Sequence, residues 1–239
     1  MKLLSVSVSM GKEVPYMGKT VTTGIFKEPV SDRVVLRTLN LDGDRQVDLR
    51  GHGGIYKAAY VYTAENYEYW KRELGRTDFK IPQFGENFTV EGMLEDQINV
   101  GDVFRVGEAL VMVTQPRVPC YKLGIKMGDP RFPKRFLQSC LVGFYFRVLE
   151  EGQVGTGDSI ELVKKDPQEM SVRKVCHLYY FDPENLEDCK RAIRIEALSP
   201  GWHEGFQDRL EKAGISVEHR EEPKEEMCCG PEGKEVLRG

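Results

Sequence analysis

The pattern of hydrophobic residues changes after Asp166-Pro167, and this change constrains the fold more than any other feature of the sequence. Before it, short hydrophobic or alternating runs are separated by Gly, Pro and Asp, as is typical of a β-rich domain. After it, hydrophobic residues recur at helical spacing. We therefore predict a β-rich domain over residues 1–165, three helices over residues 166–213 and an acidic, flexible tail over residues 214–239.

The β-rich part contains eight predicted strands. They are Lys2–Ser9, Val34–Leu39, Lys57–Tyr62, Phe88–Val90, Val103–Val106, Ala109–Thr114, Val142–Leu149 and Ser159–Val163. Gly107-Glu108 connects two of them, with Gly at the first position, where a type II′ turn needs a positive φ. Many short strands with few helices favour a barrel or a curled sheet over a parallel α/β sandwich.

Helices are predicted from capping signals and hydrophobic spacing. They are Thr63–Leu74, Pro130–Cys140, Ser171–Tyr180, one that begins at Asp182-Pro183, and one that begins at Ser199-Pro200 and ends at Gly214. The two Pro residues stand at the first helical position, where a missing N–H costs nothing. The predicted fold is mainly β with a few helical inserts, followed by a small three-helix C-terminal domain.

The charge balance excludes several classes of partner. The 239 residues include 34 basic and 38 acidic ones, a formal net charge of −4, so the chain lacks the broad positive charge on which nonspecific nucleic-acid or acidic-membrane binding depends. Over residues 182–213, eight acidic residues stand against five basic ones, which argues against a DNA-binding helix-turn-helix. We expect no nucleic-acid partner.

Localisation is predicted from what the sequence lacks. No hydrophobic run approaches the ~20 residues that cross a bilayer, and the alternating segment Lys2–Ser9 is unlike the continuous hydrophobic block of a secretory signal. The six cysteines lack the spacing of a disulfide framework, which indicates a reducing compartment. We expect a cytoplasmic protein with no membrane partner.

Two glycine-containing clusters are candidate ligand sites. The first joins Gly43-Asp44-Arg45 to His52-Gly53-Gly54 and Lys57, where paired glycines allow close backbone approach to a ligand and Lys57 can reach an anion. The second, Phe84–Phe88, holds Glu86 and Asn87 between Gly85 and aromatic residues, which suits recognition of a polar ring edge. The alternatives are a tight turn for the first cluster and a capped loop for the second.

A third cluster follows the predicted hairpin and contains a cysteine. Pro116 and Pro119 hold the loop extended, so that Arg117 and Cys120 are presented by a stiff segment. A thiol beside a guanidinium favours the thiolate, the form that acts as nucleophile or metal ligand. The alternative is a small buried thiol that packs as a hydrophobic residue. The adjacent Cys228-Cys229 lacks metal-site spacing, and the chain has no Walker loop, GxGxxG, GxSxG or HExxH motif.

Taken together and in this order, the motifs GDR…HGG..KA, FGEN and QPR.PC..L resemble those of the MOSC domain, the family named after the C-terminal domain of molybdenum-cofactor sulfurase. The match covers nearly all of residues 1–165, and the helices that follow resemble the C-terminal addition of the YiiM-like subgroup. The resemblance implies a MOSC-type β-barrel that binds a molybdenum cofactor, Mo-molybdopterin.

The resemblance also assigns residues. Cys120 would be the protein ligand to Mo, and so the catalytic residue, because a thiolate suits a soft transition-metal centre. The residues that would line the pterin and the open face of the metal are His52, Gly53, Gly54, Lys57, Gly85, Glu86, Asn87 and Arg117. Lys27, Arg45 and Lys57 would bind the terminal phosphate.

Similar proteins reduce N-hydroxylated compounds, such as hydroxylaminopurine-type base analogues, to the amine. The chain has no iron–sulfur cysteine run and no flavin or nicotinamide fingerprint. We therefore predict a separate electron-donor reductase, either a flavoprotein or an iron–sulfur protein, with the three helices as its docking surface. A homodimer is also compatible with the sequence.

Two other functions remain open at this point. In one, the protein is a sulfur carrier or cofactor-binding module with a persulfide on Cys120 and no turnover of its own. In the other, the protein is a nucleotide-binding β-barrel in which Cys120 only packs.

Overall fold

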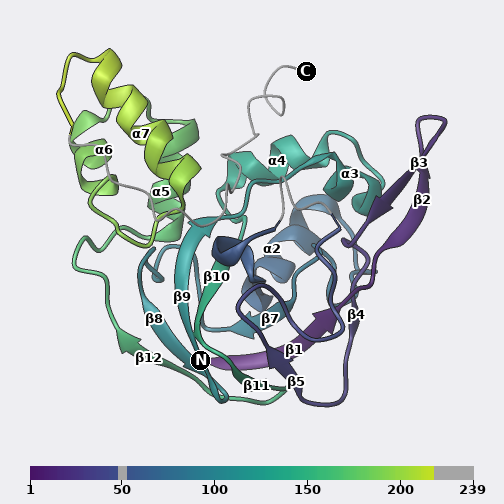
Figure 1. Ribbon diagram of the computed structural model, residues 1–239. Helices are drawn as coiled ribbons and strands as arrows, with labels where there is room; N and C mark the ends of the chain where they lie inside the picture. Colours follow the sequence, from purple (N-terminus) through teal and green to yellow (C-terminus); the bar gives the residue numbers. More distant parts are fainter. Residues whose placement is uncertain (48–52, 218–239) are drawn as a thin grey trace.

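One large sheet forms the centre of the molecule (Figure 1). The computed structural model describes residues 1–47 and 53–217, and in this part of the chain eight strands pair in one sheet. In order across the sheet they are β12 (Ile160–Lys164), β8 (Val103–Val106), β9 (Ala109–Pro116), β10 (Phe144–Glu150), β6 (Ala59–Thr63), β7 (Phe88–Glu91), β1 (Lys2–Val8) and β4 (Glu28–Pro29). Neighbours are antiparallel except β6 and β7, so the sheet is mixed.

The sheet is open, and the closed barrel that the resemblance implied is not confirmed. Its edge strands are β12 and β4. Near one corner an isolated bridge joins Lys2 to Ser159, with backbone hydrogen bonds from Leu3 to Asp158 (2.9 Å) and from Ile160 to Met1 (3.0 Å). The sheet therefore curls until β1 meets the start of β12. Among the described residues, β1 and β12 pair no further than this bridge.

Two smaller sheets accompany it. Strand β5 (Val34–Leu36) pairs with β11 (Gly152–Val154), and β2 (Lys12–Tyr16) pairs with β3 (Lys19–Thr23) in a hairpin that projects from the body (Figure 1). The pairing of β2 was missed because Lys12–Tyr16 contains a proline and two charged residues, and so lacks a strand-like hydrophobic pattern.

The predicted hairpin between β8 and β9 is present. Val106 pairs with Ala109, and Gly107 has a φ of 53°, the positive value that its position required. A side chain at Gly107 would also meet Asp158 at 2.3 Å, so the close approach of the neighbouring loop independently requires glycine.

Strand β6 begins two residues later than predicted. Residues Ile55–Lys57 form the short 3₁₀ helix η1, and the strand starts at Ala59. Gly54, with a φ of 90°, precedes η1, and the amide of Lys57 donates to the Gly54 carbonyl at 3.0 Å. This tight turn takes Lys57 out of the strand and places it at the sheet's end.

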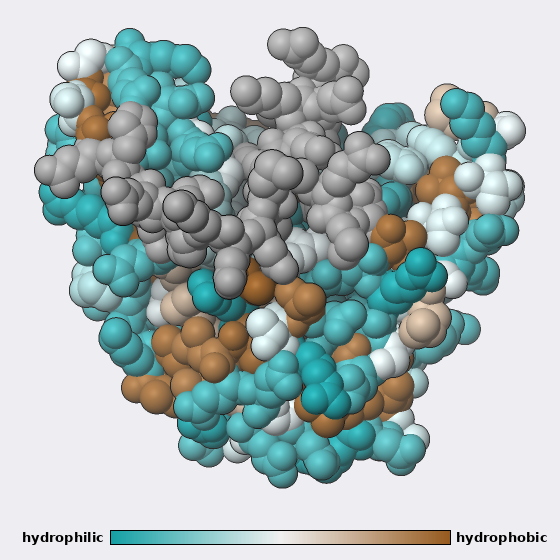
Figure 2. All heavy atoms as spheres, in the orientation of Figure 1, coloured by the Kyte–Doolittle hydropathy of each residue, from teal (hydrophilic) through white to brown (hydrophobic). Residues whose placement is uncertain are grey.

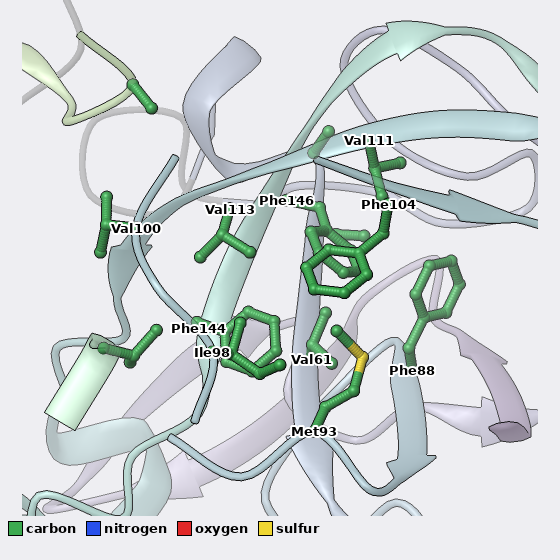
Figure 3. Packing of buried hydrophobic residues seen from close by; sticks show 14 of the residues in the cluster. Val61, Phe88, Met93, Ile98, Val100, Phe104, Val111, Val113, Phe144 and Phe146 are labelled. Atoms are coloured by element: carbon green, nitrogen blue, oxygen red, sulfur yellow. The ribbon is translucent and has the colours of Figure 1, made fainter. Parts of the chain in front are cut away.

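The central strands are buried on both faces, which accounts for their uninterrupted hydrophobic runs. On one face, side chains from β6, β8, β9 and β10 point toward one another, among them Val61, Phe104, Phe144 and Phe146 (Figure 3). The alternate residues of the same strands, such as Tyr60 and Tyr145, face the opposite way into a second cluster.

Helices α2 (Ala64–Leu74), α3 (Tyr121–Met127) and α4 (Phe132–Ser139) cover that second face. Trp70 of α2 stacks on Phe136 of α4 at a ring separation of 5.6 Å, and its indole N–H donates to the Tyr62 hydroxyl at 2.8 Å. Helix α3 was not predicted, whereas α2 and α4 lie where the hydrophobic spacing placed them.

Helices α5 (Val172–Tyr180), α6 (Leu186–Ala192) and α7 (Pro200–Lys212) form the predicted three-helix unit (Figure 1). The Ser171 hydroxyl caps α5 by accepting from the Lys174 amide at 3.1 Å. The predicted start of α6 at Asp182-Pro183 was wrong. Asn185 is the N-cap instead, since its side chain accepts from the Asp188 amide at 3.1 Å.

The three-helix unit shares one hydrophobic core with the sheet. Val175 of α5 and Trp202 of α7 belong to the same buried cluster as Val113 of β9. Backbone hydrogen bonds tie the segments together, from Val172 to Ile98 (2.9 Å) and others nearby. The visible outer surface of the unit is mostly hydrophilic (Figure 2). Among the described residues, no helix is both long and hydrophobic enough to span a membrane.

Candidate cofactor-binding cleft

The candidate site is a cleft where the ends of several strands meet. It has a cavity volume of about 100 Å³ and is partly open to solvent. Its walls come from the end of β3, the turn before the undescribed residues 48–52, η1, the loop before β7, the loop after β9, and β10. The lining residues are Thr23, Gly24, Ile25, Lys27, Asp44, Arg45, Gln46, Val47, Lys57, Ala58, Tyr60, Gly85, Asn87, Arg117, Cys120, Lys122 and Tyr145.

Cys120 lies in the wall of this cleft as a free, partly exposed thiol. It is the N-cap residue of α3, in extended backbone conformation, and its carbonyl accepts from the Leu123 amide at 2.9 Å. The two prolines before it hold the loop extended, as the sequence indicated. The thiol is therefore presented to the cleft by a segment fixed at both ends.

Arg117 lines the cleft as a buried residue, and one of its guanidinium nitrogens has no hydrogen-bond partner among the described residues. Its guanidinium lies over the rings of Tyr60 (4.9 Å) and Phe136 (5.6 Å), and its amide donates to Gly143 at 3.1 Å. Only 4% of the residue is exposed, and Nη1 has no hydrogen-bond partner among the described residues. An aromatic-stacked guanidinium with an unsatisfied N–H is suited to a planar or anionic ligand.

Lys27 lines the cleft, but its charge is already paired. Its Nζ lies 2.6 Å from Oδ1 of Asp44, and both side chains are buried. Burial lowers the pKa of Lys27, an effect that Asp44 opposes. The structure therefore gives Lys27 a partner that the phosphate-binding prediction did not foresee, and its net attraction for a phosphate is correspondingly reduced.

Asn87 and Asp44 connect several segments of the cleft wall through hydrogen bonds. The Asn87 side chain accepts from the Tyr60 amide (3.1 Å) and donates to the Ser7 carbonyl (3.2 Å) and to Oδ2 of Asp44 (3.0 Å). Asp44 also accepts from the Ser9 amide at 2.7 Å. Asn87 thus lines the cleft as predicted, while its hydrogen-bonding groups position β1, β6 and the turn at residue 44.

Glu86 does not line the cleft. Its carboxylate is fully buried on the far side of the loop, where it accepts hydrogen bonds from the hydroxyls of Tyr67 and Thr89 and from the Phe84 amide. Burial raises the pKa of Glu86. The alternation of side chains along an extended segment explains the difference, since Gly85 and Asn87 face the cleft and the residue between them faces away. In this structure Glu86 therefore holds the loop together, and its predicted cofactor-binding role stays a prediction.

Gly85 is required by close packing at the wall. Its φ is 86°, and a side chain there would meet Cγ1 of Ile25 at 2.5 Å. Of the remaining predicted residues, Arg45 and Lys57 line the cleft. Arg45 is exposed, Lys57 is buried in the wall, Gly53 and Gly54 lead into η1 without lining the cleft, and His52 lies outside the described residues.

Sequence reasoning missed several lining residues. Tyr60 and Tyr145 were treated only as parts of strands, although their ends of β6 and β10 meet at Arg117. Lys122 lies two residues after Cys120, and Asp44 belongs to the GDR motif, so both carried a signal in the sequence that was not used.

Known proteins resemble this chain in sequence and in fold. The chain matches the MOSC domain over residues 48–161 and the YiiM-like three-helix domain over residues 170–213. It is 40% identical to the uncharacterized protein YflK of Bacillus subtilis (88% of this chain, 95% of the relative) and 32% identical to protein YiiM of Escherichia coli (78% and 84%).

A solved structure and a more distant relative complete the comparison. The crystal structure of YiiM from Geobacillus stearothermophilus superposes with a TM-score of 0.73 at 36% identity, covering 87% of this chain and 98% of that one. A protein of Gibberella moniliformis named reductase is 29% identical over 66% of this chain, but the match spans only 29% of that protein. The chain therefore belongs to the MOSC domain family, in its YiiM-like subgroup.

Proposed function

We propose that this protein binds a molybdenum cofactor in the cleft and reduces N-hydroxylated compounds with electrons from a separate reductase. The observation that carries the proposal is that one cleft is lined both by the Cys120 thiol and by Arg117, whose buried Nη1 has no hydrogen-bond partner among the described residues. Membership in the MOSC family and the relative named reductase support it.

The residues of the cleft fit such a group. A soft thiol and a guanidinium with one N–H group unsatisfied among the described residues suit a metal that carries an anionic organic ligand. Cys120 would hold the metal, and the guanidinium of Arg117 would bind a negatively charged or carbonyl edge of the cofactor. When bound, the cofactor would supply the redox centre at which the N–O bond is reduced.

The chain's own residues would orient the ligand and neutralise its charge. Arg45 at the mouth and Lys57 in the wall are the cations placed to attract a phosphate. The aromatic rings of Tyr60 and Tyr145 close one side of the cleft and exclude water from it. Asn87 keeps these strands in register, so its contribution is to position other residues rather than to react.

The experiment is metal analysis of purified protein from a host that makes the cofactor, combined with an assay on a hydroxylaminopurine and a chemical reductant. We expect stoichiometric molybdenum and turnover in the wild type, and loss of both in Cys120→Ser. Cys189→Ser is the matched control, because Cys189 is a buried cysteine of α6 outside the cleft. Full turnover by metal-free protein would contradict the proposal.

A second variant tests the role of Arg117 in cofactor binding. Arg117→Met keeps an unbranched, apolar side chain but removes the guanidinium and its unsatisfied N–H, and we expect the cofactor content to fall at least tenfold. If the variant retains full cofactor, Arg117 does not bind the cofactor, and the proposal is contradicted. A sulfur atom found on Cys120 by mass spectrometry, without bound molybdenum, would instead support the sulfur-carrier function.

A further inference from the structure

Two cysteines outside the cleft meet where the three-helix unit joins the sheet. Cys140 ends α4, and Cys176 lies in the middle of α5. Their thiols hydrogen-bond each other, and both residues belong to the aromatic cluster that covers one face of the sheet. Both are free cysteines, and the proposed function uses neither.

The backbone at Cys140 is unusual for a residue with a side chain. Its φ is 53°, in the left-handed region that normally selects glycine at the end of a helix. This backbone conformation fixes the direction of the Cα–Cβ bond of Cys140. The position therefore keeps a thiol at a local backbone cost that glycine would avoid.

The two thiols are in unequal surroundings. The hydrogen bond from Cys176 lowers the pKa of Cys140, against the effect of burial, and the charge of Arg173 acts in the same direction as the hydrogen bond. The same hydrogen bond and complete burial raise the pKa of Cys176. Of the two, Cys140 is therefore the thiol that ionises more readily.

A buried carboxylate lies close to the pair. Oε1 of Glu95 accepts from the amide of Gly143, three residues after Cys140, at 2.9 Å, and Oε2 has no hydrogen-bond partner among the described residues. The charge of Glu95 acts on both thiols. Because Oε2 of Glu95 has no hydrogen-bond donor among the described residues, it can accept the proton that a thiol of the pair releases.

The segment that follows Cys140 is part of the scaffold of the cleft. The carbonyls of Leu141 and Val142 accept from the hydroxyls of Tyr62 (3.0 Å) and Tyr60 (2.9 Å), and the Gly143 carbonyl accepts from the Arg117 amide (3.1 Å). A covalent link at Cys140 would therefore connect α5 to the strand ends that carry Tyr60 and Arg117.

We propose that Cys140 and Cys176 form a redox-sensitive dithiol that a hydroperoxide converts into an intramolecular disulfide between α4 and α5. The Cys140 thiolate attacks the peroxide oxygen, the O–O bond breaks, and water leaves once the second oxygen is protonated. The sulfur of Cys176 then displaces the oxygen from the resulting sulfenic acid as a second water. The two thiols lose two electrons, which the peroxide gains.

The burial of the pair selects among oxidants. Cys140 is 3% exposed and Cys176 is fully buried, so a bulky disulfide cannot reach them, whereas hydrogen peroxide is little larger than water. This site acts independently of the cofactor, so its test needs no reductase activity.

The test is peptide mapping of the full-length protein, without reductant, after treatment with hydrogen peroxide. Trypsin places Cys140 in residues 136–147 and Cys176 in residues 175–190, and we expect these peptides to be joined with the loss of two hydrogens. The second peptide also contains Cys189, so the Cys189→Ser variant must form the same link. The link must be absent in Cys176→Ser.

Cys140→Gly serves as a second variant, since glycine suits the backbone at this position and the protein should fold. The disulfide closes a loop of some 37 residues, and we expect oxidation to raise the unfolding midpoint of the wild type by about 10 °C and that of Cys140→Gly not at all. Separate, unlinked thiols after peroxide treatment, or a link from either cysteine to Cys120, Cys228 or Cys229, would overturn the proposal.

Discussion

Asp44 is the residue on which most of the cleft wall depends. Its carboxylate accepts from the Ser9 amide and from Asn87, and it is ion-paired with Lys27. We expect Asp44→Asn to destabilise the protein by about 3 kcal/mol, because it leaves the buried Lys27 ammonium without its counter-charge. Denaturant unfolding measures this loss.

A matched control for Asp44 is available on the surface. Glu68 of α2 is ion-paired with Lys71 at 2.7 Å, but the pair is exposed to solvent. Glu68→Gln should therefore cost less than about 0.5 kcal/mol. If the two variants lose stability equally, the buried pair has no special role.

Lys126 gives the stability of the protein a specific dependence on pH. Its Nζ donates to the carbonyls of Ile25 (2.9 Å) and Pro82 (2.5 Å), and burial lowers its pKa to about 8. Between pH 8 and 10.5 the unfolded chain binds more protons at this lysine than the folded one, so its contribution to the free energy of unfolding rises with pH in this window and is lost as pH falls through 8.

The variant Lys126→Met isolates that contribution. We expect the wild type to gain about 2 kcal/mol relative to Lys126→Met between pH 8 and pH 10. Urea unfolding of both proteins at several pH values measures the difference. Parallel pH profiles of the two proteins would show that Lys126 titrates normally in the folded state.

The sequence motifs predicted the lining of the cleft well where two lining residues belong to the same short loop. Arg117 and Cys120 lie in one rigid proline-bounded segment, so their proximity in sequence is kept in space. The sequence did not show that the Glu86 side chain turns away from the cleft, because the direction of a side chain in an extended loop depends on the register with which the loop enters the strand. The pairing of Lys27 with Asp44 joins residues 17 positions apart, and the motifs gave no indication of it.

At the scale of the element, the caps of the last helices differ in strength. The Ser171 side chain accepts a hydrogen bond from an amide of α5, whereas Ser199 at the start of α7 makes no side-chain cap. We expect Ser171→Ala to cost about 1 kcal/mol and Ser199→Ala to cost a few tenths. Thermal unfolding of the two variants compares them directly, and the reverse order would contradict the cap assignment.

Elements with a strong local pattern were predictable, and elements formed by distant contacts were not. Strands β1, β8 and β9 and helices α2, α5 and α7 follow hydrophobic spacing that is visible in the sequence. Helix α3, seven residues with two lysines and a glycine, has too little pattern to be found. Strand β11 forms only because β5 lies beside it, which no local signal reports.

At the scale of the molecule, the sheet and the three-helix unit should unfold together. The chain has two tryptophans, Trp70 on α2 and Trp202 on α7, and both are buried. In Trp70→Phe the fluorescence reports on the three-helix unit, and in Trp202→Phe it reports on the sheet. Because one hydrophobic cluster spans both parts, we expect each fluorescence transition to coincide with the far-UV circular dichroism transition of the same variant.

Separate transitions would show that residues 166–213 form an independent domain, as the change in sequence pattern alone would imply. The sequence could not settle this point, because the pattern that marks a change of secondary structure carries no information on whether the core continues across it. The predicted electron donor and homodimer concern surfaces beyond the single chain, and they stay predictions.

The hairpin of β2 and β3 has a practical consequence. Its turn at Met17-Gly18 is exposed, with Met17 84% accessible, and strand β3 leads directly into Thr23 and Ile25 of the cleft wall. A fluorescent dye attached at this turn would sit at the end of a hairpin whose base lines the cleft. The hairpin thus offers an optical reporter of occupancy, with which loading of the cleft can be followed in real time without any catalytic turnover.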